Sequence, residues 1–118
     1  MKRGLHHRWA AAVGALALVA CVEQTPPLYH WDEYQPQVYQ YFKGDGSSEQ
    51  EQIGKLEASA QRALAKGEAL PPGFHAHLGL LYLKAGNSDS AREAFLAEQA
   101  EFPESMAYMD FLLKNFKN

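Results

Sequence analysis

The 118-residue sequence contains one cysteine, Cys21, so no disulfide can form within the chain. Basic residues are also scarce, and no cluster of lysine and arginine occurs after Arg8. Nucleic-acid binding is therefore disfavoured, because neutralising phosphates requires a basic surface. The apolar run from Trp9 to Val19 has 11 residues. It is too short to span a bilayer, which takes about 20 residues in a helix.

The amino-terminal segment has the pattern of a secretory signal. Three basic side chains precede the apolar run, namely Lys2, Arg3 and Arg8. The run ends in Leu18, Val19, Ala20 and Cys21, which resembles the lipobox of bacterial lipoproteins. The resemblance implies that the Cys21 thiol receives a diacylglycerol, that cleavage occurs before it, and that the new amino terminus is acylated. The alternative is an ordinary signal peptide with an incidental cysteine.

We expect three regions: a lipoprotein signal peptide at 1–20, a lipidated tether at 21–28 and one domain at 29–118. The signal contains three of the 11 basic residues and none of the 14 acidic ones, so the mature chain has a net charge of −6. Anionic headgroups would repel such a domain, so attachment should depend on the lipid alone. Val22, and not aspartate, follows Cys21. By resemblance to the enterobacterial sorting rule, this points to the outer membrane, with the domain in the periplasm.

The spacing of apolar residues predicts an all-α domain of five helices, because no segment shows sustained alternation. The first helix should place Tyr34, Val38, Tyr41 and Phe42 on one face, with Pro36 in its first turn and a stop at 44–46. The second should begin at Ser48 with a capping box to Glu51 and end at Gly67. Its apolar stripe consists of Ile53, Leu56, Ala60, Ala63 and Leu64.

Three further helices are expected after the connector 70–73. The third should span 74–85 and bury Phe74, Leu78, Leu81, Tyr82 and Ala85. The fourth should be capped by Ser88 and bury Ala91, Ala94, Phe95 and either Ala97 or Glu98. The fifth should be capped by Ser105 and bury Met106, Met109, Leu112, Leu113 and Phe116.

The third and fourth helices carry the spacing of a single tetratricopeptide repeat between residues 72 and 105. The matching residues are Leu78, Gly79, Tyr82, Ala91, Phe95 and Pro103. Gly79 should allow close approach of the two helices, and Ala91 should lie where they cross. Glu98 stands where the repeat has alanine, and His75 replaces a large aromatic residue. A lone repeat cannot bury its own faces, so the flanking helices should cap it.

Most of the mature chain resembles small bacterial outer-membrane lipoproteins that contain a domain of unknown function. The resemblance lies in Tyr29-x-Trp31, in Tyr34-x-Pro36-x-Val38-Tyr39-x-Tyr41, and in the segments 71–82, 102–105 and 109–113. Asp32 departs from it, because glycine is expected after the tryptophan. Members tend to be encoded beside a lipoprotein resembling the curli secretion channel and beside a second small lipoprotein. The resemblance therefore implies these two envelope lipoproteins as partners, and it implies no activity.

No catalytic, metal or cofactor site is predicted. His75 and His77 are two positions apart on a helix, so they point in different directions and cannot chelate one ion together. The sequence has no nucleophile motif of a hydrolase.

We therefore expect a non-enzymatic, lipid-anchored interaction module, with the helix at 74–85 lining its concave face. The candidate contact residues are Trp31, Tyr39, His75 and His77. The alternative is an accessory protein that contacts peptidoglycan or another glycan through Trp31 and the tyrosines.

Overall fold

The computed structural model describes residues 21, 25–44 and 46–116. The expected signal peptide, with Leu18, Val19 and Ala20, lies outside these residues. The described part contains five α-helices, one 3-10 turn and no strand, which confirms the all-α prediction. None of its helices has both the length and the apolarity that crossing a bilayer requires.

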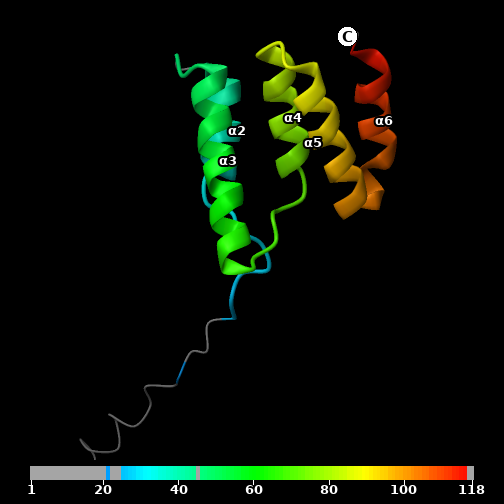
Figure 1. Cartoon of the computed structure of the whole chain (residues 1–118). Helices are drawn as coiled ribbons and strands as arrows, with labels where there is room; N and C mark the ends of the chain where they lie inside the picture. The colour runs from blue at the N-terminus through cyan, green and yellow to red at the C-terminus, as the bar shows by residue number, and fades with distance from the viewer. Residues whose placement is uncertain (1–20, 22–24, 45, 117–118) are drawn as a thin grey trace, which may run out of the picture.

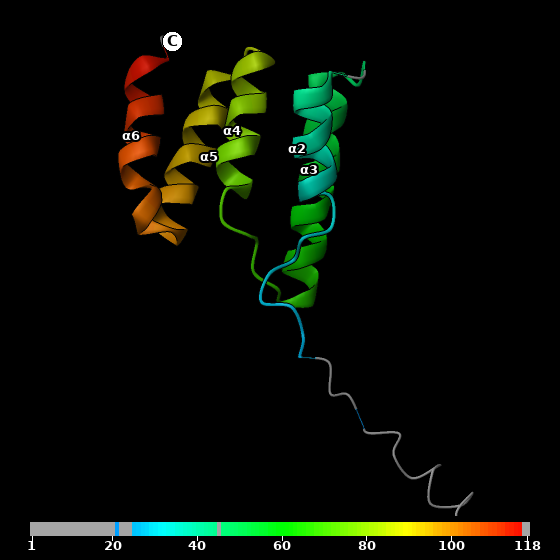
Figure 2. The same ribbon diagram turned by 180° about the vertical axis from the view of Figure 1, so that it is seen from behind.

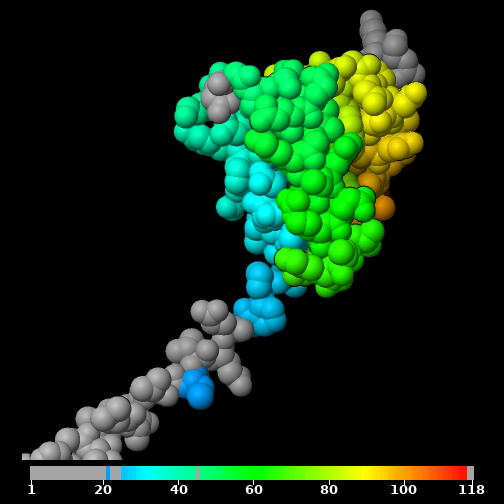
Figure 3. Space-filling model, turned by 60° about the vertical axis from the view of Figure 1, so that its left-hand side comes forward, coloured from blue at the N-terminus to red at the C-terminus, as the bar shows by residue number. Residues whose placement is uncertain are grey.

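The helices stack side by side in three layers (Figures 1 and 2). Their bounds are α2 Tyr34–Lys43, α3 Glu49–Lys66, α4 Phe74–Lys84, α5 Ser88–Glu101 and α6 Met106–Asn115, with the turn η2 Pro103–Ser105 before α6. The first layer pairs α2 with α3, the second pairs α4 with α5, and α6 lies mainly against α5. The chain enters the domain at the end where α3 finishes, and Figure 3 shows the described residues just before Tyr29, in blue, at this end.

The predicted ends of α2 and α3 are confirmed. The Ser48 hydroxyl accepts a hydrogen bond from the main-chain N–H of Glu51 at 3.1 Å. Both helices end at glycines in the left-handed conformation, Gly44 at φ 63° and Gly67 at φ 67°. Such a φ is strained for any residue with a side chain, so these glycines set the helix ends.

Two of the predicted core residues in these helices are exposed. Phe42 is 79% exposed and Leu64 is 75% exposed. The buried face of α2 is centred on Gln37, and that of α3 includes Ser59, which is 0% exposed. Phe42 and Leu64 each lie about 100° around the helix from their buried or half-buried neighbours Tyr41 and Ala63, and this rotation carries them into solvent.

The core consists of two apolar clusters that share α4. The first joins Phe74, Leu78 and Leu81 of α4 to Ile53 and Leu56 of α3. The second contains Ala91, Phe95 and Met109, with half-buried α4 residues packed against it. Within α4, whose residues are all described, only Lys84 is exposed. Little of the helix predicted to line a concave face is therefore left for a partner.

The caps of the last two helices differ from the prediction. The Asn87 side chain, and not Ser88, accepts a hydrogen bond from Ser90 N–H at 3.1 Å. The Ser105 hydroxyl donates to the Phe102 carbonyl at 2.7 Å, so it does not cap α6. The turn η2 leads directly into α6, and Met106 at their junction is 50% exposed.

Candidate interaction groove

The segment before α2 is fastened to the end of α3. The His30 N–H donates to the Ala69 carbonyl at 2.7 Å, beside an isolated bridge between Tyr29 and Ala69. The buried His30 ring has Nδ1 at 2.6 Å from Glu68 and Nε2 at 3.4 Å from Asp32. This network fixes the position of Tyr29 next to the connector between α3 and α4.

Asp32 occupies the position after Trp31 at which glycine is expected. Its φ of 24° is positive, which side chains rarely adopt and aspartate tolerates better than most. Its carboxylate accepts a hydrogen bond from Arg62 Nε at 2.8 Å. This bond lowers the pKa of Asp32 below its ordinary value. The turn therefore forms without glycine, and the Arg62 contact offsets part of its strain.

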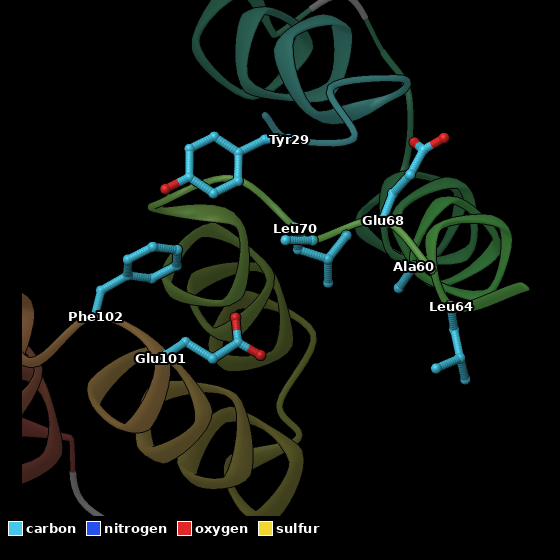
Figure 4. Close-up of a pocket in the computed structure, with 8 residues that line it drawn as sticks. Tyr29, Ala60, Leu64, Glu68, Leu70, Glu101 and Phe102 are labelled. Carbon is cyan, nitrogen blue, oxygen red and sulfur yellow. The ribbon is translucent and has the colours of Figure 1, made fainter. Parts of the chain in front are cut away.

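An open groove of about 400 Å³ lies at this end of the domain (Figure 4). It is lined by Tyr29, Ala60, Leu64, Glu68, Ala69, Leu70, Glu101 and Phe102. These residues come from four separate segments: the segment before α2, the end of α3, the connector and the end of α5. Six of the eight are apolar or aromatic, so the walls favour an apolar occupant.

Aromatic rings extend from the groove toward α2. The Tyr29 ring makes T-shaped contacts with the rings of Trp31 and Phe102. In each pair the ring centroids are 6.2 Å apart. The Trp31 ring stacks on Tyr34 at 6.2 Å and is 42% exposed. Trp31 therefore lies next to the groove, in contact with Tyr29 of its lining, and part of the Trp31 ring is accessible.

The two carboxylates of the lining each face a histidine. Glu68 contacts His30, and the Glu101 carboxylate lies 3.5 Å from His75 Nε2. Both carboxylates remain accessible, with side-chain exposures of 41% for Glu68 and 48% for Glu101. None of the eight described lining residues is basic. The lining therefore places two accessible carboxylates among apolar side chains, with no lysine or arginine among the described residues that line it.

The structure brings together only two of the four predicted contact residues. Trp31 contacts Tyr29 of the groove lining, and His75 lies beside Glu101 of the lining. Tyr39 is 60% exposed on α2, with the Lys43 ammonium 5.3 Å from its ring, and does not line the groove.

The expectation that His77 contacts a partner is wrong. His77 is 7% exposed and lies between the rings of Tyr34 and Tyr41. Burial lowers its pKa below the ordinary 6.5, and a hydrogen bond with the Gln37 main chain works in the opposite direction. The helix period could not distinguish this buried position from the accessible one at His75.

The repeat-like residues lie at the crossing of α4 and α5. A Cβ atom placed on Gly79 would lie 2.4 Å from Phe95 Cε1, so the ring occupies the space that only glycine leaves open. Ala91 is 0% exposed, and Leu78 is 7% exposed. The Tyr82 hydroxyl donates to Glu57 of α3, and burial together with this carboxylate raises the pKa of Tyr82. Pro103 follows the end of α5 and begins η2.

Glu98, the residue that departs from the repeat pattern, is 2% exposed. Its carboxylate accepts hydrogen bonds from Gly73 N–H at 2.7 Å and from Ala76 N–H at 3.3 Å. These groups belong to the amino-terminal end of α4, which lacks a side-chain cap of its own. Glu98 therefore caps α4 from α5, where a negative charge also interacts favourably with the helix dipole.

Another hollow, of about 250 Å³, lies between α4 and α5. It is lined by His75, Leu78, Tyr82, Ser90, Glu93, Ala94 and Ala97. It is the accessible part of the predicted hairpin face. Among the described residues, no group of three or more His, Cys, Asp and Glu side chains could hold a metal ion.

None of the eight lining residues is among the four predicted contact residues, and this includes the bulky Tyr29, Leu70 and Phe102. Two of them directly precede prolines, at Leu70-Pro71 and Phe102-Pro103. A residue before proline is biased toward an extended conformation at the end of a helix. This signal identifies apolar residues that lie beyond the end of a helix. It does not show that such residues contact one another in the fold.

The described residues thus form an all-α domain of stacked helices with one open, apolar and acidic groove beside the tether. The family model described as "Domain of unknown function (DUF4810)" matches residues 28–112. The chain belongs to this family. No curated protein and no solved structure is similar enough to match it.

Proposed function

We propose that the protein is a non-enzymatic, lipid-anchored interaction module on the periplasmic face of the outer membrane. It serves as an accessory subunit of an outer-membrane lipoprotein complex. By resemblance, its partners are a lipoprotein similar to the curli secretion channel and a second small lipoprotein. Cys21 carries the lipid, and residues 22–28 connect it to the domain.

The observation that carries this proposal is the position of the groove. Its lining includes Tyr29, the residue that directly follows the expected tether. Apolar walls and a partly exposed tryptophan are features of protein contact sites, where the few residues that dominate the binding energy are enriched in tryptophan and tyrosine. A domain anchored through Cys21 would hold this groove close to other proteins of the same membrane.

A second candidate function follows from Trp31 itself. A partly exposed indole ring that stacks on Tyr34 can also pack against a sugar ring. This favours the alternative of an accessory protein that contacts peptidoglycan. Retention of the purified protein on isolated cell wall would support it, whereas co-purification of envelope proteins at fixed stoichiometry supports the first proposal.

The anchor is tested by Cys21→Ser in the full chain, because only the thiol can accept the diacylglycerol. We expect the variant to lose lipidation, measured by mass spectrometry, and to leave the outer-membrane fraction after a high-salt wash. A variant that remains in that fraction would contradict lipid anchoring.

Contact through the groove is tested in the same cells with Trp31→Ala and, as a matched control, Tyr39→Ala. Tyr39 is another exposed aromatic residue, but its ring lies beside Lys43 on α2, whereas the Trp31 ring contacts Tyr29 of the lining. We expect both variants to keep the helical circular-dichroism signal. Trp31→Ala should lose the co-purified envelope partner, and Tyr39→Ala should retain it. Loss of helical signal in Trp31→Ala would show that Trp31 is a core residue and would count against its role in contact.

A further inference from the structure

The charge of the groove restricts what can occupy it. The lining has two accessible carboxylates, Glu68 and Glu101, and the eight described residues include no lysine or arginine. The nearby Arg62 guanidinium already binds Asp32. An acidic or phosphate-bearing ligand would meet repulsion here, whereas a cation would find acceptor oxygens.

The walls restrict the occupant further. Apolar and aromatic side chains from four segments surround the hollow, and Leu64 at its edge is 75% exposed (Figure 4). A volume of about 400 Å³ in an open groove suits a few side chains of a polypeptide. An apolar segment would cover Leu64 and the Phe102 ring, and flanking cations would reach the carboxylates.

We propose that the groove binds a short polypeptide segment in which aliphatic residues are flanked by lysine or arginine. The aliphatic side chains pack against Leu64, Leu70 and Phe102. A flanking basic group pairs with Glu101, and a second one pairs with Glu68. Burial of apolar area supplies most of the affinity, and the charge pairs select the partner.

The tether adds a restriction that rests on the proposed lipid anchor. Eight residue steps separate Cys21 from Tyr29, so the groove lies at most about 29 Å from the lipidated sulfur along an extended chain. Basic residues are common where a polypeptide meets an anionic membrane surface. The partner segment is therefore one that lies next to the membrane in another envelope protein.

The protein contains its own reporter for a binding experiment. The sequence has two tryptophans, Trp9 and Trp31, and cleavage before Cys21 leaves Trp31 alone, in contact with Tyr29 of the lining. The mature lipoprotein in a neutral detergent is titrated with the synthetic peptide acetyl-Lys-Leu-Leu-Lys-amide while Trp31 fluorescence is recorded. The matched probe acetyl-Glu-Leu-Leu-Glu-amide has the same aliphatic core with opposite charge.

We expect the basic peptide to bind and the acidic peptide to show no saturable signal. Adding salt should weaken the basic peptide's binding, because accessible charge pairs are screened. Replacing both carboxylates, with Glu68→Gln and Glu101→Gln, should weaken it by about three- to tenfold, as expected for two exposed pairs. Asp89→Asn is the matched control, since it removes a charge from the opposite end of α5. It should leave the affinity unchanged.

The apolar contribution is tested in parallel with Leu64→Gln and with Leu96→Gln, which is 49% exposed and outside the lining. Only Leu64→Gln should weaken binding. Equal binding of the two peptides, or equal effects of the groove and control variants, would overturn the proposal. The result is independent of the anchor: if Cys21→Ser stays with the membrane while the basic peptide binds as expected, the anchor fails and the groove assignment stands.

Discussion

Glu98 shows how one residue that departs from a sequence pattern can have a specific structural role. The repeat pattern has alanine at this position, and a buried carboxylate without partners would be strongly unfavourable. Here two main-chain N–H groups at the start of α4 satisfy it. Gly73, the first of these donors, adopts a φ of 89° and has no side chain that could cap the helix. Glu98 of α5 therefore replaces the side-chain cap that α4 lacks.

Glu98→Ala restores the residue of the repeat pattern, and we expect it to destabilise the protein. It removes the acceptor of Gly73 N–H and Ala76 N–H, which should lower the free energy of unfolding by about 1–3 kcal/mol. Urea unfolding followed by circular dichroism measures the change. Glu104→Ala, at an exposed glutamate in η2, is the control and should change stability by less than about 0.5 kcal/mol. Equal values for the two variants would show that Glu98 does not cap α4.

At the scale of the helices, the sequence predicted most of the fold because its signals are local. Glycines at 44 and 67, the Ser48 cap and Pro103 lie close to the helix ends that they define. The errors are local too. Phe42 and Leu64 lie one residue beyond a buried or half-buried position, and which edge of an apolar stripe is covered depends on how neighbouring helices are rotated.

The groove could not be predicted in the same way, because its lining comes from segments distant in the chain. Tyr29 and Phe102 have ring centroids 6.2 Å apart although 73 positions separate them in the sequence. No helical period relates them. Their meeting depends on the His30–Glu68 contact and on the path of the connector, which exist only in the folded domain. Trp31 and His75 could be predicted as candidates, one as an aromatic residue near the tether and the other as a polar residue on the open face of the expected hairpin.

The close packing of α4 on α5 leads to a prediction at Gly79. Gly79→Ala should lower the free energy of unfolding by about 1–3 kcal/mol, because its Cβ would overlap the Phe95 ring. This loss should exceed the gain in helix propensity of about 1 kcal/mol. The matched control is Gly54→Ala in α3, where a Cβ meets nothing within 4 Å. It should raise the free energy of unfolding by about 0.5–1 kcal/mol.

A double variant separates overlap with Phe95 from other effects of Gly79→Ala. Phe95→Leu shortens the side chain that occupies the space above Gly79. If overlap is the cause, Gly79→Ala should cost less in the Phe95→Leu background than in the parent chain. Purely additive effects would mean that the helices do not cross at these two residues.

Considered as a whole, the molecule is an array in which α4 joins two clusters. Tyr82 of α4 packs against both of them, and its hydroxyl donates to Glu57 of α3. Each layer contacts mainly its neighbour, as in helical-repeat arrays. The groove and the entry of the tether share one end of this array. A partner could therefore bind at this end without separating the layers that provide stability.

The stability of the whole molecule should depend on pH through His77, which joins α4 to the aromatic residues of α2. Its pKa is below 6.5 in the folded state, so the unfolded chain binds a proton first as pH falls. The free energy of unfolding should therefore decrease between pH 7.5 and pH 5.5, measured by urea unfolding at each pH. His77→Gln, which cannot titrate, should reduce this decrease. Parallel pH profiles for the parent chain and His77→Gln would exclude His77 as the cause.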